Sequence, residues 1–360
     1  MKRVFISDCE GPISRNDNAF ELTAHFVPNG DRLFTVISRY DDVFADFLKR
    51  PSYKAGDTLK LILPFLKAYD VTDDKMRKFS ARNLVLIAGI KNTLDHLRKV
   101  AHVYVVSTSY EHYIMALCQA LDFPYENTYC TKLSLDQYHM TKEEKEKLQN
   151  IAKEISQMPI IEIPFKARVL NDFREEDQKI IQRLDEIFWK EIACTDCGRI
   201  FSEVNPVGGS EKANAVEDIA KRTSVALVDS MYVGDSITDV EAFQVVKENG
   251  GLTVSFNGNQ YAIKNAEIAI LSENSIVTSV IADVFSRLGK QPTLSFAENW
   301  SRNALMKSSV NQSLLNGLFR LYPGELPKVK IITTQNMENL AKESTEFRKK
   351  VRGEAIGRLG

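Results

Sequence analysis

The sequence predicts an α/β protein with an open, mainly parallel sheet flanked by helices. Three short runs rich in β-branched and aromatic residues, 4–6, 102–106 and 231–233, end abruptly in small or acidic residues, as buried parallel strands do. Helical patterns lie between them, at residues 90–100 and 213–220. Strands that alternate with helices form a sheet whose ligands bind at the carboxyl ends of the strands.

Composition and charge limit the classes of function. The 360 residues are 44% hydrophobic and 26% charged, which is enough for a sizeable core in two or three lobes. Lys and Arg number 47 against 48 Asp and Glu, so no global field favours nucleic acid or an anionic membrane. The first apolar run is too short for a signal peptide or a membrane span. Five scattered cysteines fit a reducing compartment, and we expect a cytoplasmic protein.

Polar residues with catalytic potential follow the predicted strands or begin a predicted helix. A single acidic pair at a strand end is common, and Gly-Asp-Ser by itself usually marks a turn. Here several such features occur together, each at the end of a strand or the start of a helix, and the combination is specific. In chain order these residues are Asp8, Glu10, Ser107, Lys212, Asp235 and Asp239.

The order and spacing of these residues resemble the four motifs of the haloacid dehalogenase superfamily. The resemblance implies phosphoryl transfer, which needs an in-line nucleophile, a proton donor for the leaving oxygen, and positive charge around the phosphoryl oxygens. By this resemblance Asp8 is the nucleophile and forms an aspartyl-phosphate, while Glu10 transfers protons in both half-reactions. Ser107 would hydrogen-bond a phosphoryl oxygen, and Lys212 would neutralise charge.

The same resemblance implies a metal cofactor. Asp8, the backbone carbonyl of Glu10 and Asp235 would bind Mg²⁺, with Asp239 orienting the site from behind. These ligands are all oxygens, which suits Mg²⁺ and disfavours a soft metal.

One branch of the superfamily is more similar than the others. Asp-x-Glu-Gly in the first motif and "VYVVSTSYEHYIMALCQALDFPYENTYCTKL" around the second resemble phosphoserine phosphatases and the bifunctional phosphoserine phosphatase/homoserine phosphotransferase. Most superfamily members have Asp in place of Glu10. Asp17 occupies the place of a substrate-binding carboxylate, and Thr108 that of a glycine, so both are candidate substrate-binding residues. The whole chain also resembles archaeal superfamily members labelled energy-converting hydrogenase A subunit R, a label that describes association.

The segments between the motifs predict further lobes. A stretch with a helical pattern of apolar residues, "TLKLILPFLKAYDV", predicts a cap, which in this superfamily closes over the substrate. A charged stretch with a helical pattern, "TKEEKEKLQNIAKEI", predicts a second inserted lobe. The expected division is a catalytic core of residues 1–13, 85–135 and 204–287, a helical cap of 14–84, an inserted lobe of 136–203 and a C-terminal helical extension of 288–360.

Two features outside the motifs have more than one interpretation. Cys194 and Cys197 have the spacing of half a zinc site, which Cys130 and His139 could complete, but two unliganded thiols in a turn are the favoured reading. A predicted helix over residues 339–352 ends in basic residues that suit the helix dipole, beginning at Arg348. The alternatives for this extension are a homodimer contact or docking on a protein partner.

The favoured function is a Mg²⁺-dependent phosphatase acting on a small phosphorylated metabolite, with no nucleic-acid partner. A phosphotransferase of the same mechanism is an alternative. A second alternative is a non-catalytic regulatory or complex-associated protein on the same scaffold, suggested by Glu10, the inserted lobe and the long extension. The presence of Lys212 and Asp235 favours the enzyme.

Overall fold

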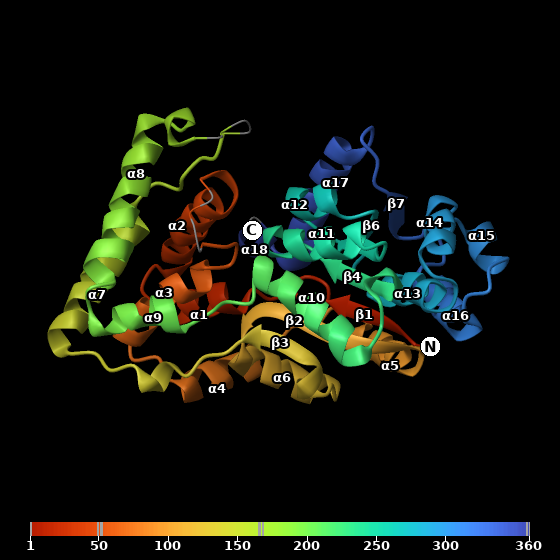
Figure 1. Cartoon of the computed structure of the whole chain (residues 1–360), viewed down its shortest axis with the longest axis horizontal. Helices are drawn as coiled ribbons and strands as arrows, with labels where there is room; N and C mark the ends of the chain where they lie inside the picture. Colours follow the sequence, from red (N-terminus) through yellow and green to blue (C-terminus); the bar gives the residue numbers. More distant parts are fainter. Residues whose placement is uncertain are drawn as a thin grey trace.

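A seven-stranded sheet forms the centre of the protein, described in a computed structural model for residues 2–48, 50, 53–164, 167, 169–357 and 359 (Figure 1). The strand order is β3-β2-β1-β4-β5-β6-β7. The first six strands are parallel, and β7 joins the edge antiparallel to β6. The strands are β1 (Arg3–Ser7), β2 (Ala101–Tyr110), β3 (Thr128–Thr131), β4 (Ser230–Gly234), β5 (Leu252–Phe256), β6 (Ile268–Leu271) and β7 (Lys328–Ile331).

Helices cover both faces of the sheet because successive strand side chains point in opposite directions. Phe5 packs in the hydrophobic cluster that includes α5, α6 and α13, whereas Val4 and Ile6 pack in the cluster that includes α10 and α11. The helices of these two layers are α5 (Ile90–Val100), α6 (Glu111–Leu121), α10 (Ser210–Thr223), α11 (Val240–Glu248), α12 (Gln260–Asn265) and α13 (Ile276–Leu288). This arrangement confirms the predicted α/β class, and the three predicted strands are β1, β2 and β4.

The sheet topology determines where the motif residues meet. β1 lies between β2 and β4, and all three run parallel. The residues that follow β1 and β4 therefore lie at the same edge of the sheet, together with the irregular end of β2, whose register to β3 shifts between Val106 and Tyr110.

A layer of helices stands beside this edge of the sheet (Figure 1). Its members come from two separate segments of the chain, yet their apolar side chains form one continuous cluster. Phe188 of the second segment packs on Tyr40 and Phe65 of the first. The elements are α1 (Asn18–Phe26), α2 (Gly30–Asp42), the π-helical turn η1 (Val43–Phe47), α3 (Thr58–Ala68), α4 (Asp73–Asn83), α7 (Lys142–Gln157), α8 (Glu175–Glu186), the π-helical turn η5 (Ile187–Ile192) and α9 (Ile200–Glu203). The domain boundaries expected from the sequence remain predictions.

The C-terminal segment returns to the sheet and then to the edge where the motif residues lie. β7 pairs with β6 through the register Ile268 to Ile331, a strand that the sequence analysis does not predict. The long helix α17 (Met337–Arg352) packs along α12, and the short helix α18 (Glu354–Gly357) lies between the helical layer and the sheet (Figure 1). The elements are α14 (Lys290–Glu298), α15 (Arg302–Met306), α16 (Gln312–Leu321), α17 (Met337–Arg352) and α18 (Glu354–Gly357). Among the described residues, no helix has both the length and the apolar character to cross a bilayer.

Candidate active site

Asp8 lies in the loop directly after β1 and is buried. Its backbone N–H donates to the carbonyl of Val233 on β4 at 2.8 Å, which ties the loop to the neighbouring strand. The Cys9 N–H donates to Oδ1 of Asp8 at 2.6 Å, and Lys212 Nζ lies 2.8 Å from Oδ2. Burial raises the pKa of Asp8 to about 7, while the nearby ammonium of Lys212 opposes this shift.

Lys212, in the first turn of α10, is a fully buried cation. Its Nζ contacts Asp8 and also donates to Oδ1 of Asp239 at 2.7 Å. Burial alone would lower the pKa of this ammonium, but the two carboxylates outweigh burial and raise the pKa. Lys212 therefore stays charged and provides fixed positive charge beside Asp8, as the motif resemblance implies.

Asp239, at the end of the 3₁₀ turn η8 (Ile237–Asp239), is saturated by protein donors. Oδ1 accepts hydrogen bonds from Lys212 and from the Tyr232 hydroxyl at 2.8 Å. Oδ2 accepts from the backbone N–H groups of Asp235 at 2.8 Å and Ser236 at 3.0 Å. The side chain thus holds Lys212 and the loop of Asp235 in place.

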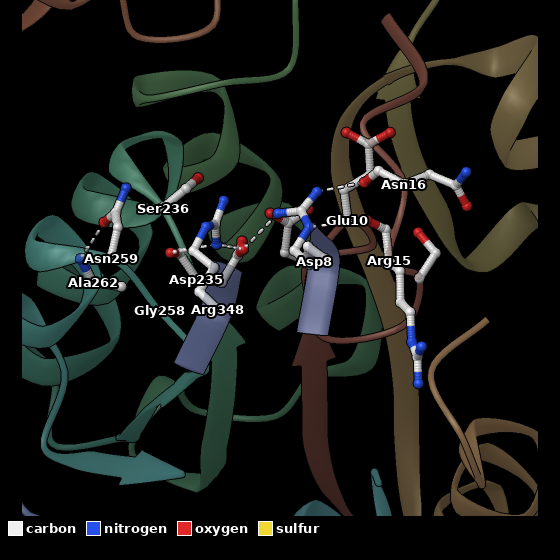
Figure 2. A network of polar contacts seen from close by, with 12 residues as sticks. Asp8, Glu10, Arg15, Asn16, Asp235, Ser236, Gly258, Asn259, Ala262 and Arg348 are labelled. Carbon is white, nitrogen blue, oxygen red and sulfur yellow. Dashed lines mark hydrogen bonds and ion pairs between the residues drawn. The ribbon is translucent and has the colours of Figure 1, made fainter. Parts of the chain in front are cut away.

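Asp235 follows β4 and lies opposite Asp8 across the end of the sheet, with its carboxylate packed against the first motif loop (Figure 2). A Cβ on Gly11 would lie 2.2 Å from Oδ2 of Asp235, and Gly11 has φ +106°. Only glycine fits both the backbone conformation and the space, which explains the Gly in the Asp-x-Glu-Gly sequence.

Two arginines from α17 contact Asp235, and the sequence analysis does not place them in the site. Arg348 Nη1 donates to Oδ2 of Asp235, and Arg352 Nη1 lies 3.0 Å from the same oxygen. Arg348 and Arg352 are only 3% and 8% exposed. The favoured interpretation of this basic helix end from the sequence is packing or capping, and the Arg348 side chain does pack in the protein interior, where the carboxylate that it meets is Asp235.

Glu10 and Asp17 form an acidic pair near Asp8. The Asn18 N–H donates to Oε1 of Glu10 at 2.7 Å, and Asp17 caps α1 by accepting from the Phe20 N–H at 3.0 Å. Burial, together with the charge of Asp17, raises the pKa of Glu10 well above its usual range. A carboxyl group that keeps its proton near neutral pH can act as a general acid.

Ser107 and Thr108 occupy the irregular end of β2. Ser107 is buried, and its Oγ lies 3.0 Å from the Ser109 hydroxyl and accepts from the Ser109 N–H at 3.2 Å. Thr108 Oγ1 is a buried atom without a hydrogen-bond partner in the described structure. A Cβ on Gly56 of the helical layer would lie 2.8 Å from Thr108 Cγ2, so the two parts of the protein are in close contact here.

Four of the motif residues, Asp8, Glu10, Ser107 and Asp235, line one small cavity at the end of the sheet. Its volume is about 90 Å³, below the roughly 300–1,000 Å³ of typical small-molecule pockets. Residues from three parts of the chain line it. The lining includes Asp8, Glu10, Asp17, Ser107, Thr108 and Asp235 near the sheet, Phe34, Ser38, Asp41, Asp42, Thr58 and Leu59 from the helical layer, and Arg348, Arg352 and Leu359 from the C-terminal segment.

The acidic cluster has the chemistry of a site for a hard divalent cation. Carboxylate oxygens of Asp8, Asp235 and Asp239 lie within 4.8 Å of one another, and oxygen ligands suit Mg²⁺. Two further carboxyl groups, Glu10 and Asp17, line the neighbouring cavity, and the cations that contact the aspartate trio are Lys212, Arg348 and Arg352.

The zinc ligand set considered as the alternative for Cys194 and Cys197 does not come together among the described residues. Cys197 is buried with its Sγ 3.9 Å from the carbonyl of His139, and Cys194 is exposed. Cys130 instead lies 3.7 Å from the Tyr125 hydroxyl. Within the described part of the chain, the only group of three or more potential metal ligands is the aspartate trio. The structure therefore gives no support to a four-ligand zinc site at Cys194 and Cys197.

Solved structures similar to this chain include one of full length. A gene product from Archaeoglobus fulgidus is 24% identical, with a TM-score of 0.80, and the match covers 100% of this chain and 99% of that one. A phosphoserine phosphatase in its apo form is 16% identical, with a TM-score of 0.42, over 76% of this chain and 96% of that one. A substrate-bound phosphoserine phosphatase is 14% identical, with a TM-score of 0.46, over 78% and 98%.

A family model matches a segment that contains most of the sheet and its flanking helices. A search of curated proteins finds no match. The family model of haloacid dehalogenase-like hydrolases matches residues 89–283, which is more than half of the chain. The matched segment contains Ser107, Lys212, Asp235 and Asp239, and Asp8 joins them through the pairing of β1 with β2 and β4. The chain therefore belongs to the haloacid dehalogenase-like hydrolase family.

Proposed function

We propose that this chain is a Mg²⁺-dependent phosphatase that hydrolyses a small phosphomonoester through an aspartyl-phosphate on Asp8. The observation that carries this proposal is the buried contact of Asp8 with Lys212, next to the carboxylates of Asp235 and Asp239. A nucleophilic carboxylate beside a fixed cation and a cluster of oxygen ligands is what phosphoryl transfer requires.

In the first half-reaction, a carboxylate oxygen of Asp8 forms a bond to phosphorus while the bond from phosphorus to the leaving oxygen breaks. Glu10 gives its proton to that oxygen, so the product leaves as an alcohol. Lys212 and Ser107 stabilise the negative charge on the phosphoryl oxygens. The divalent cation, held by Asp8, the Glu10 carbonyl and Asp235, would supply further neutralisation of that charge.

In the second half-reaction, water attacks phosphorus, and Glu10, now ionised, takes the proton of that water. The bond between phosphorus and Asp8 breaks, which releases inorganic phosphate and regenerates the carboxylate. The small volume of the cavity, about 90 Å³, supports a small substrate. Phosphoserine is the first candidate, with Asp17 and Thr108 as proposed substrate-binding residues. An acceptor alcohol in place of water would make the same chemistry a phosphotransfer.

A screen of phosphorylated metabolites with Mg²⁺ tests this proposal. We expect release of inorganic phosphate from at least one small phosphomonoester, and none from the Asp8→Asn variant. A regulatory function on the same scaffold is the second candidate, favoured by the two arginines that contact Asp235. Absence of turnover across the screen, together with a stable protein partner in pull-downs, would favour that candidate.

A further inference from the structure

The C-terminal helix α17 places two guanidinium groups in the cavity that contains Asp8. Arg348 and Arg352 are four residues apart, so they lie on the same face of the helix. Both line the cavity, and both contact Oδ2 of Asp235. Figure 2 shows the Arg348 side chain directed at Asp235, in the space between the ends of β4 and β1. Neither arginine lies within the segment that matches the family model.

The two arginines differ in how firmly the protein holds them. Arg352 donates from Nε to the carbonyl of Arg15 at 3.0 Å and from Nη2 to the carbonyl of Asn16, so the loop after β1 holds it. Arg348 makes its contacts through Nη1 alone, to the carboxylate of Asp235 and to its carbonyl at 3.2 Å. Its Nε is buried without a hydrogen-bond partner in the described structure. A buried guanidinium with donors to spare indicates a missing acceptor.

A divalent cation at Asp235 would change the position of Arg348. Both guanidinium groups contact Oδ2 of Asp235, and a cation bound to the same carboxylate would repel them strongly at such short range. The repulsion is relieved if an anion lies between them, because each oxygen of a phosphoryl group can accept a hydrogen bond. Arginine suits this role, since its planar fork of donors matches phosphate geometry.

We propose that Arg348 and Arg352 are substrate-binding residues, and that Arg348 exchanges Asp235 for the substrate's phosphoryl group when a divalent cation binds. Arg352 keeps its hydrogen bonds to the loop after β1 and directs its remaining donors toward the same group. This inference rests on the proposed function, because it assigns the phosphoryl group of the same substrate. It makes the C-terminal helix a component of the active site.

Equilibrium binding of inorganic phosphate and of Mg²⁺ to the full chain, measured by calorimetry, tests the exchange without turnover. With Mg²⁺ present, we expect Arg348→Gln to weaken phosphate binding roughly tenfold, and Arg348→Lys to weaken it less because the charge remains. Without phosphate, Arg348→Gln should bind Mg²⁺ more tightly than wild type, since a competing cation is gone. Lys350→Gln is the matched control, because it removes one charge from the same helix at a side chain that is 68% exposed.

Several results would overturn the exchange. The exchange is wrong if Arg348→Gln and Lys350→Gln bind phosphate with equal affinity. This holds even if Arg348→Gln binds Mg²⁺ more tightly, because Arg348 would then only cover the metal site. If Arg348→Gln does not fold, the phosphate affinity of Arg348→Lys is measured in its place. A wild-type affinity in Arg348→Lys would exclude a contact between the phosphoryl group and the forked guanidinium of Arg348. Failure of wild type to bind phosphate with Mg²⁺ also overturns this inference, whereas labelling of Asp8 tests the proposed phosphatase separately.

Discussion

At the scale of single residues, two glycines allow the acidic groups to approach the backbone of the motif loops. A Cβ on Gly234 would lie 2.5 Å from Cγ of Asp239, and one on Gly11 would lie 2.2 Å from Oδ2 of Asp235. Both positions therefore require glycine if the two carboxylates are to pack this close to the loops. The sequence motifs identify the adjacent residues Glu10 and Asp235, whereas the contacts that require glycine are visible only in the structure.

Gly11→Ala should damage the site more than an equivalent change elsewhere. Gly353 is the matched control, because it also has positive φ but no atom within 4 Å of an added Cβ. We expect Gly353→Ala to cost about 1 kcal/mol of stability from backbone strain alone. Gly11→Ala should cost about 1–3 kcal/mol more from the clash and should weaken Mg²⁺ binding by displacing Asp235. Thermal denaturation and Mg²⁺ calorimetry measure both effects; equal behaviour of the two variants would refute the close approach.

Glu21 gives a test of pH dependence away from the motif residues. Burial raises the pKa of Glu21 from 4.5 to about 7, although both carboxylate oxygens accept from Asn16 Nδ2. The folded state therefore binds this proton more tightly than the unfolded state, so the stability contributed by the protonated group is lost as pH rises from about 4.5 to 7.

Glu21→Gln should remove that loss. The gain in unfolding free energy relative to wild type should be near zero at pH 4 and roughly 1 kcal/mol at pH 8, since partial exposure screens the effect. Urea denaturation at both pH values measures it. A gain that is larger in acid than in base would show that the pKa of Glu21 is not raised.

At the scale of elements, the helical layer and α17 show where sequence patterns are informative. In the helices of the layer, apolar residues recur with the period of an α-helix. Helix α7 also begins with a capping box, in which the side chains of Thr141 and Glu144 each hydrogen-bond the other's backbone. In α17, Leu340, Ser344, Arg348 and Arg352 recur every four residues on one buried face. A buried helix face that contains arginines requires acidic partners, but the sequence pattern does not reveal which carboxylate they meet.

The helical layer should unfold as one unit, because its two chain segments share a single cluster. Phe188 is fully buried between them, against Tyr40, Phe65 and Phe201. Phe188→Ala should cost about 3–5 kcal/mol and should accelerate hydrogen exchange in α2 and α3 as well as in α7 and α8. Val169→Ala, at an exposed position, is the control. Faster exchange confined to α7 and α8 would mean that the segments are separate units.

At the scale of the whole molecule, three parts that are distant in the sequence line one cavity. The loops at the end of the sheet supply Asp8, Glu10 and Asp235, the helical layer supplies Asp41 and Asp42, and α17 supplies two arginines. We expect the helical layer to select the leaving group of the substrate, and the two arginines of α17 to contribute positive charge to the cavity.

Removal of metal tests the charge balance of the site. We expect EDTA to abolish phosphatase activity and added Mg²⁺ to restore it, because all candidate ligands are oxygens. Asp235→Asn keeps an oxygen ligand but removes one negative charge, so it should raise the Mg²⁺ concentration needed for half-maximal activity. Activity that persists unchanged after chelation would show that the acidic cluster does not act through a metal.

The sequence predicted the sheet and the motif cluster more completely than the parts that cover them. Asp8 and Asp235 follow strands, and Ser107 follows the apolar run within β2; these runs are locally distinctive, and the parallel order brings the strand ends together. By contrast, β7 is a four-residue edge strand whose pairing depends on β6 more than 50 residues earlier in the chain. The position of Arg348 depends on the same return of the chain, and no local pattern encodes such a long-range contact.

The most direct test of the central claim is whether phosphate becomes attached to Asp8. A rapid acid quench with a labelled aryl phosphate, followed by peptide mapping, should find label on Asp8 in wild type and none in Asp8→Asn. Glu10→Gln should accumulate more label, because an activated leaving group needs little protonation whereas hydrolysis of the intermediate still needs a base. Label on another residue, or turnover in Asp8→Asn equal to that of wild type, would contradict the account.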